Sequence, residues 1–295
     1  MKKRIFLLLL IVTLLCGCRS AVPQQTAAPS YSFLTVHYLD VGQADAMVLE
    51  CDGEFAVIDA AYADNTDDIL AYMNRLGVGK LKLVVGTHPH EDHVGGLSYI
   101  IDAFPTEHFW FSEIPFTNPM LDFLMARLDA NQITMEQPKP GHTLQLGSAT
   151  VTVLGPVRTD YEDVNNISLV LMVEHGENRF LFTGDMELEG ETDLIESGAD
   201  IRADVLKVGH HGSYSSTGYR LLRQSAPTYA VISVGANNEY GHPHDDPMSR
   251  LRDAEVIVHR TDKQYTVTAV SDGKDIFFSW ENPYAQPWDP RNESP

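Results

Sequence analysis

A short apolar segment that runs directly into a cluster of histidines and acids constrains this chain most strongly. LKLVVGTH is typical of a buried strand, and the histidines and acids fill residues 88–93. In extended backbone, side chains two positions apart point to the same side, so His88 and His90 can reach one cation. A turn at the following Gly-Gly would aim Asp92 and His93 at a second point nearby. The segment therefore predicts a two-metal site at the end of a strand.

Other ligand-type side chains lie in short motifs farther along the chain. Asp185 ends the apolar segment FLFTGD, and we expect its carboxylate to bridge the two metals. VGHHGS supplies His210 and His211, and YGHPH supplies His242 and His244. Histidine is the commonest metal ligand, and His242 is expected to be one of the ligands here.

The remaining chain alternates between strand and helix patterns. Asp52-Gly53 predicts a hairpin turn, Thr66 is expected to cap a helix, and Asp59 ends a strand, where it can orient a ligand histidine. The pattern favours an α/β domain with mixed sheets inside and helices outside. Strands are predicted at residues 33–41, 46–51, 55–60, 81–88, 143–156, 167–185, 203–211, 229–235, 256–261 and 265–280, and helices at 66–78, 96–104, 119–133, 216–226 and 246–255.

The N-terminus is typical of a bacterial lipoprotein signal. A basic start precedes an apolar run that ends in Leu-Cys-Gly-Cys, so residues 1–17 are expected to be cleaved and Cys18 to carry lipid. An uncleaved membrane anchor is the alternative, and either places the rest outside the cytoplasmic membrane. Residues 18–31 are expected to be a flexible tether, 32–282 the folded domain and 283–295 a loose tail.

Composition limits the partners. The chain has 41 acidic and 21 basic residues and a formal net charge of −20, so its field repels nucleic acid over long range. A polyanionic substrate would have to be held locally, by metal or by a few placed cations. Cys51 is the one cysteine outside the signal region, which excludes an intrachain disulfide in the mature protein. No protein partner is indicated.

Taken together, these motifs resemble those of the metallo-β-lactamase superfamily. The strand-end Asp59, the cluster at 88–93, Asp185 and a later histidine carry the resemblance. DVGQADA, NNISLVL, ADVLKVGHHGS and YGHPH look more narrowly like the hydrolase domain of ComEC-type competence proteins and like secreted phosphorylcholine esterases. The resemblance covers residues 33–280. It implies a four-layer αββα sandwich with a metal site along one edge of two facing sheets.

Two departures from the family pattern matter. The long membrane channel of the competence proteins is not in this sequence, so this chain is not expected to import DNA itself. Where many members have a third histidine, Asn165 or Asn166 stands here, which leaves one metal short of a ligand. We expect His210 to fill that place and His211 to protonate the leaving oxygen. Asn166 and His244 are expected to support the ligands rather than bind metal.

The expected activity is hydrolysis of a phosphodiester by a metal-activated hydroxide, which Asp92 could help to hold. Nitrogen and oxygen ligands fit two Zn²⁺ or Mn²⁺ ions and do not separate them. The substrate could be a nucleic acid or a cell-wall or phosphocholine phosphodiester. Hydrolysis of a lactone or β-lactam, and a non-catalytic surface binding protein, are the alternatives. Specificity is expected in loops within residues 105–142.

Overall fold

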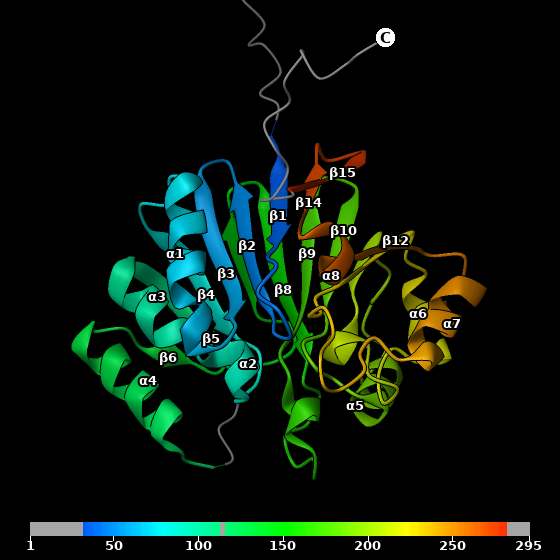
Figure 1. Cartoon of the computed structure of the whole chain (residues 1–295), viewed down its shortest axis with the longest axis horizontal. Helices are drawn as coiled ribbons and strands as arrows, with labels where there is room; N and C mark the ends of the chain where they lie inside the picture. Colours follow the sequence, from blue (N-terminus) through cyan, green and yellow to red (C-terminus); the bar gives the residue numbers. More distant parts are fainter. Residues whose placement is uncertain (1–31, 113–115, 282–295) are drawn as a thin grey trace, which may run out of the picture. The chain divides into compact units, whose positions relative to one another are not determined.

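Two mixed β-sheets face each other, and helices cover both outer surfaces (Figure 1). The computed structural model describes residues 32–112 and 116–281. The expected signal peptide and tether, and the tail from residue 283, lie outside the described residues. Within the described ranges, no helix is both long and apolar enough to cross a membrane.

The first sheet has the strand order β15-β14-β1-β2-β3-β4-β5-β6. The neighbours from β3 to β6 pair in parallel, and the remaining pairs are antiparallel. The strands are β1 (Leu34–Tyr38), β2 (Ala46–Cys51), β3 (Glu54–Ala60), β4 (Leu81–Gly86), β5 (Thr106–Phe111), β6 (Met135–Glu136), β14 (Thr266–Ser271) and β15 (Ile276–Glu281).

The second sheet has the order β13-β12-β11-β10-β9-β8-β7, and it too has a parallel part and an antiparallel part. Strands β10 to β13 pair in parallel, and β7 to β10 are antiparallel. The strands are β7 (Thr143–Leu146), β8 (Ala149–Gly155), β9 (Val170–His175), β10 (Asn178–Phe182), β11 (Val205–Lys207), β12 (Tyr229–Ile232) and β13 (Ile257–Arg260).

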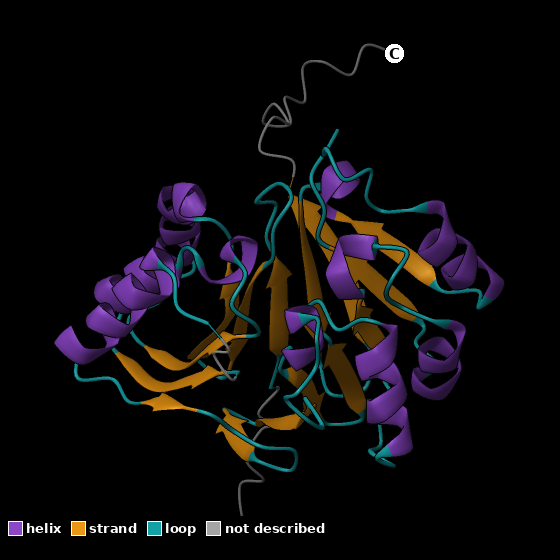
Figure 2. Ribbon diagram, turned by 90° about the horizontal axis from the view of Figure 1, so that it is seen from below, coloured by secondary structure: helices purple, strands orange, loops and turns teal. Residues whose placement is uncertain are grey.

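The longer helices lie outside the sheets, as Figure 2 shows from below. The first sheet is covered by α1 (Thr66–Arg75), α3 (Leu97–Ala103) and α4 (Pro119–Ala130), and the second by α5 (Leu188–Glu196), α6 (Tyr219–Ser225) and α7 (Asp245–Asp253). Short α2 (Glu91–Val94) and α8 (Thr261–Gln264) lie in connections, as do the 3₁₀ turns at Ala63–Asn65, Val164–Ile167 and Gly209–Gly212.

Three apolar clusters correspond to the three interfaces between these four layers. The middle cluster joins the two sheets and includes Trp110 and Phe180, both fully buried. The outer clusters join each sheet to its helices, for example through Phe109 and Leu206. Burial of apolar area on both faces of each sheet is the main stabilising contribution to such a fold. The predicted αββα sandwich is confirmed.

Some local predictions are confirmed and others are wrong. Asp52 and Gly53 form the β2–β3 turn with φ of 52° and 79°, as the Asp-Gly pair predicts. Thr66 does not cap α1 but is its first residue, and its hydroxyl donates to the Ala63 carbonyl. Strand β5, which buries the consecutive aromatic residues 109–111, was not predicted. Helix α5 was missed, because only three of its nine residues, Leu188, Leu194 and Ile195, are large and apolar while four are acidic.

The carboxyl ends of the parallel strands in both sheets point to one edge of the sandwich. There β3 ends near Asp59, β4 leads into the His-rich loop, and β10 leads into Asp185. Loops after parallel strands are the usual place for a site in α/β sheets, because their ends are open to solvent.

Gly96 fixes the His-rich loop against β3. Its amide donates to the Ala61 carbonyl, and a Cβ added at Gly96 would lie 2.2 Å from the Ala60 carbonyl oxygen. We predict that Gly96→Ala lowers the free energy of unfolding by about 1–3 kcal/mol, because backbone must move to relieve the overlap.

Thermal unfolding of the metal-free protein checks this prediction. About 2–4 °C is expected per kcal/mol in a domain of this size. Gly79→Ala is the matched control, because a Cβ there meets nothing within 4 Å. Equal melting temperatures for the two variants would show that Gly96 is not needed for close packing.

Candidate metal centre

The loop after β4 starts with a hydrogen-bonded arrangement that orients His88. The Thr87 amide and hydroxyl donate to the two carboxylate oxygens of Asp59 at 2.8 and 2.7 Å. Because the hydroxyl of Thr87 uses its hydrogen in the bond to Asp59, its oxygen can only accept from His88 Nδ1, which lies 3.2 Å away. The lone pair of His88 is then on Nε2, which lies 3.0 Å from His90 Nδ1. The two rings thus present nitrogen atoms to one point, as expected for two ligands of one cation.

Asp59 orients His93 in the same way. His93 Nδ1 lies 2.8 Å from Asp59 Oδ2, so the ring proton is on this nitrogen and Nε2 carries a lone pair. That Nε2 is 3.2 Å from Asp185 Oδ2 and 3.8 Å from Asp92 Oδ2. His93 Nε2 is buried and has no hydrogen-bond partner among the described residues. A lone pair that faces carboxylate oxygens needs a proton or a metal cation between them.

His210 and His211 follow β11 with left-handed backbone, at φ of 48° and 50°. Such conformations cost free energy for non-glycine residues and concentrate at functional sites. His210 Nδ1 lies 3.1 Å from Glu187 Oε1, and His211 Nδ1 lies 3.0 Å from the Ser233 carbonyl. In both rings Nδ1 thus carries a proton, which leaves Nε2 as the atom that could bind a cation.

Both of these adjacent side chains face Asp185. Both Nε2 atoms lie 3.7 Å from the same atom, Asp185 Oδ2, because the left-handed backbone turns both rings toward it. His211 is buried, and its Nε2 is also 3.2 Å from Asp92 Oδ2. His211 therefore belongs to a cluster of side chains that could hold a metal ion, and its role as proton donor to a leaving group stays a prediction.

Asp185 is the point on which the centre converges. Its Oδ2 lies 3.9, 3.2, 3.7 and 3.7 Å from the Nε2 atoms of four histidines, namely His88, His93, His210 and His211. One ligand atom each from Asp92, His93, Asp185 and His211 lie within 4.8 Å of one another. Asp185 Oδ1 is buried without a hydrogen-bond partner in the described part of the chain. The residues present therefore fit a pair of cations with a bridging carboxylate.

The charges of the centre favour cations. Burial alone would raise the pKa of Asp185, but His93 and His211 outweigh burial and hold it well below its usual value. Burial opposes protonation of His211, yet Asp185 and Asp45 outweigh it and raise its pKa to about 10. The pKa of His88, by contrast, is lowered by burial and by nearby His93. Metal binding would displace protons from this site and so weaken as pH falls.

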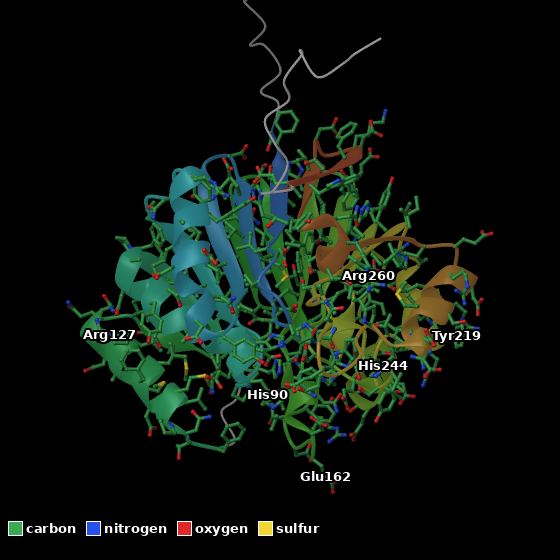
Figure 3. The ribbon with its side chains drawn as sticks, viewed as in Figure 1. His90, Arg127, Glu162, Tyr219, His244 and Arg260 are labelled. Atoms are coloured by element: carbon green, nitrogen blue, oxygen red, sulfur yellow. The ribbon has the colours of Figure 1, made fainter. Side chains whose placement is uncertain are left out.

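A cavity of about 320 Å³ opens over these residues. Asp92, Asp185, His210 and His211 form its floor, and its remaining lining residues are Gln43, Tyr62, His90, Glu91, Tyr240 and His242. None of the described lining residues is a lysine or arginine. In Figure 3, His90 lies at the lower edge of the sandwich, whereas Arg127 and Arg260 lie away from it and pair with Asp102 and Asp262.

Three expected site residues occupy less central positions. His242 lies at the side of the cavity, where its Nδ1 meets Gln43, and it belongs to neither cluster of possible metal ligands among the described residues. His244 Nδ1 accepts the Tyr214 amide. Asn166 accepts the amides of Glu187 and Gly190, which fixes the start of α5. Its neighbour Asn165 has a buried Oδ1 with no hydrogen-bond partner in the described chain.

Sequence reasoning missed a buried ion pair behind the centre. Lys207 Nζ lies 2.9 Å from Asp45 Oδ2, and both side chains are at most 1% exposed. Asp45 Oδ1 lies 3.4 Å from His211 Nδ1. Burial disfavours the charge on Asp45, but Lys207 and His211 outweigh burial and lower its pKa. A lysine inside the apolar strand ADVLKVG was the signal that could have revealed the pair.

An αββα sandwich with a histidine–carboxylate metal centre at one edge defines a class of metal-binding α/β protein. The chain belongs to the metallo-beta-lactamase superfamily, whose family model matches residues 39–236. It is 33% identical over 199 residues to "ComE operon protein 3" of Bacillus subtilis, covering 68% of this chain and 26% of that protein. It is 30% identical over 243 residues to "Recombination protein 2" of Haemophilus influenzae, covering 81% and 28%. The chain thus spans about a quarter of the length of these relatives.

Solved structures support the fold. The metallo-beta-lactamase fold protein YhfI from Bacillus subtilis superposes with a TM-score of 0.51 at 11% identity, covering 83% of this chain and all of that one. At this identity the similarity concerns the fold alone.

We predict that the Asp45–Lys207 pair supports the centre mainly through charge balance. Lys207→Met should lower the free energy of unfolding by about 3–5 kcal/mol, because it leaves a buried carboxylate unpaired beside His211. Combining it with Asp45→Asn should recover most of that loss, because the buried charge is then removed. Urea unfolding followed by tryptophan fluorescence measures both variants. If the double variant is as unstable as Lys207→Met, the carboxylate's charge is not what destabilises the single variant.

Proposed function

We propose that this protein is a binuclear metallohydrolase that cleaves phosphodiesters. The observation that carries the proposal is the convergence of four histidine Nε2 atoms on Asp185 Oδ2, beside Asp92. When bound, two divalent cations would lower the pKa of a shared water and neutralise charge that develops on phosphoryl oxygens. Zn²⁺ and Mn²⁺ both suit these nitrogen and oxygen donors.

The side chains divide into two ligand groups that share Asp185. His88 and His90 would hold one cation, and His210 would complete that group in place of a family histidine. Asp92 and His93 would hold the other. We assign His211 to this second group, since its Nε2 lies close to Asp92 Oδ2.

Asp92 has a further role at the cavity. Its side chain is 23% exposed and lines the cavity floor, so a carboxylate oxygen can accept a proton from an attacking water and orient it. Asp59 and Glu187 keep His93 and His210 in the tautomers that ligation needs.

The lining of the cavity favours a small phosphodiester over a polymeric nucleic acid. A groove that follows a nucleic-acid backbone normally carries lysine and arginine, and the described lining has neither. The competence relatives keep a nucleic acid among the candidates, whereas the acidic composition of this chain favours a cell-wall or phosphocholine phosphodiester.

We also propose that the protein acts outside the cytoplasmic membrane. The lipobox-like Leu-Cys-Gly-Cys after a short apolar run supports lipid attachment at Cys18. Lipid at that position would hold the domain at the membrane surface, with residues 18–31 between them.

We predict hydrolysis of bis-p-nitrophenyl phosphate by the metal-loaded protein and none of nitrocefin or a simple lactone. Asp185→Asn should reduce the rate to background, because the bridging oxygen loses its charge. An oligonucleotide and a glycerophosphodiester, assayed in parallel, separate the two substrate classes. Gly79→Ala is the control variant and should retain wild-type rate.

A further outcome would reverse the proposal. Faster turnover of nitrocefin or the lactone than of every phosphodiester would assign the site to carbonyl chemistry. No turnover by a protein shown to carry metal would favour a binding role.

A further inference from the structure

His242 differs from the other histidines of the centre in what its ring atoms contact. It lines the same cavity as Asp92 and His210, with its ring centroid 5.7 Å from that of His210. Tyr240 stacks on it at 5.6 Å. Its Nδ1 faces Gln43 Nε2 at 3.2 Å, and its Nε2 has no hydrogen-bond partner within the described chain. Its function therefore depends on which nitrogen carries the proton.

Gln43 decides that question because its amide can point only one way. The Gly235 backbone amide donates to Gln43 Oε1 at 3.1 Å, so the oxygen faces Gly235 and the NH₂ group faces His242. An NH₂ group can only donate, so His242 Nδ1 accepts and the ring proton is on Nε2. The two loops approach closely here, since a Cβ at Gly235 would lie 2.7 Å from the Gln43 backbone nitrogen.

The resulting tautomer is the reverse of that in the ligand histidines. His93, His210 and His211 donate from Nδ1 and present a lone pair at Nε2. His242 accepts at Nδ1 and presents an N–H at Nε2. In this state His242 cannot bind a cation through Nε2.

We propose that His242 is a neutral hydrogen-bond donor to a phosphoryl oxygen of the substrate, and that Gln43 is the positioning residue that fixes its tautomer. This inference rests on the proposed phosphodiesterase function. Donors placed where negative charge develops stabilise a transition state without moving a proton. A neutral imidazole is too weak an acid to protonate a leaving group, so His242 would act on the phosphoryl oxygen rather than on the leaving oxygen.

The surroundings of His242 keep it neutral. Gln43 presents its NH₂ group to His242 Nδ1, so a proton on Nδ1 would face another N–H donor, which disfavours the imidazolium. A donor that stays neutral does not repel the cations expected beside it, which a positively charged residue would do.

The first test is spectroscopic and does not depend on turnover. The full chain, loaded with diamagnetic zinc and labelled with ¹⁵N-histidine, should show His242 as the Nε2–H tautomer in long-range ¹H–¹⁵N spectra, with His242→Phe giving the assignment. Gln43→Glu keeps an acceptor for Gly235 but turns a carboxylate toward Nδ1. It should move the ring proton to Nδ1 or give the imidazolium. An Nδ1–H tautomer in the wild type would overturn the proposal.

The second test is kinetic. His242→Phe should lower kcat for phosphodiesters by ~10²–10³-fold, the usual effect of removing one such donor, and leave metal content unchanged. The loss should be equal for p-nitrophenyl and alkyl leaving groups, and His242→Asn should recover part of it. Gln43→Glu should lower kcat without loss of metal. His142→Phe, on the exposed surface, is the control.

The outcomes separate the alternatives. Loss of metal from His242→Phe would make His242 a ligand, and a loss that grows with poorer leaving groups would make it a general acid; either result overturns the proposal. An unchanged rate in both variants would also overturn it. If the wild type cleaves no phosphodiester, the proposed function itself fails. The NMR measurement does not require turnover, so it would still test the tautomer of His242 separately.

Discussion

Hydrogen bonds to the Nδ1 atoms of the histidines are the interaction on which the metal centre depends. Asp59, Glu187 and the Ser233 carbonyl each accept a proton from a different ring, and so turn its Nε2 lone pair toward Asp185. The acceptors come from β3, the loop before α5 and the end of β12, which the two sheets bring to one edge. The sandwich therefore matters for chemistry because it places acceptors behind the rings as well as the rings themselves.

The sequence predicted the parts of this centre that local pattern controls. The loop at 88–93 and Asp185 follow apolar strands directly, so their position at the sheet edge could be inferred without knowledge of the packing. The direction in which His211 points could not, because the left-handed backbone conformation of His210 and His211 is not encoded in strand or helix periodicity. Gln43, which selects the tautomer of His242, lies 199 residues from it in sequence. Only the folded chain brings these two together.

The acidic composition has a structural counterpart in the placement of the few basic side chains. Lys207 is used behind the centre to balance Asp45, and Arg127, Arg158, Arg179 and Arg260 pair with neighbouring acids. The described lining of the cavity is left with carboxylates, imidazoles, two tyrosines and the amide of Gln43. An anionic substrate would then rely on the bound cations and on neutral donors such as His242. This is a different solution from the basic grooves that hold nucleic acids.

We propose that Asp185 Oδ2 lies between two cation positions. The most direct measurement is anomalous diffraction from crystals grown with Mn²⁺ or Zn²⁺ and recorded on both sides of the metal's absorption edge. We expect two peaks that flank Asp185 Oδ2, one next to His88 and His90 and the other next to His93 and His211. A single peak away from Asp185, or no peak at saturating metal, would contradict it.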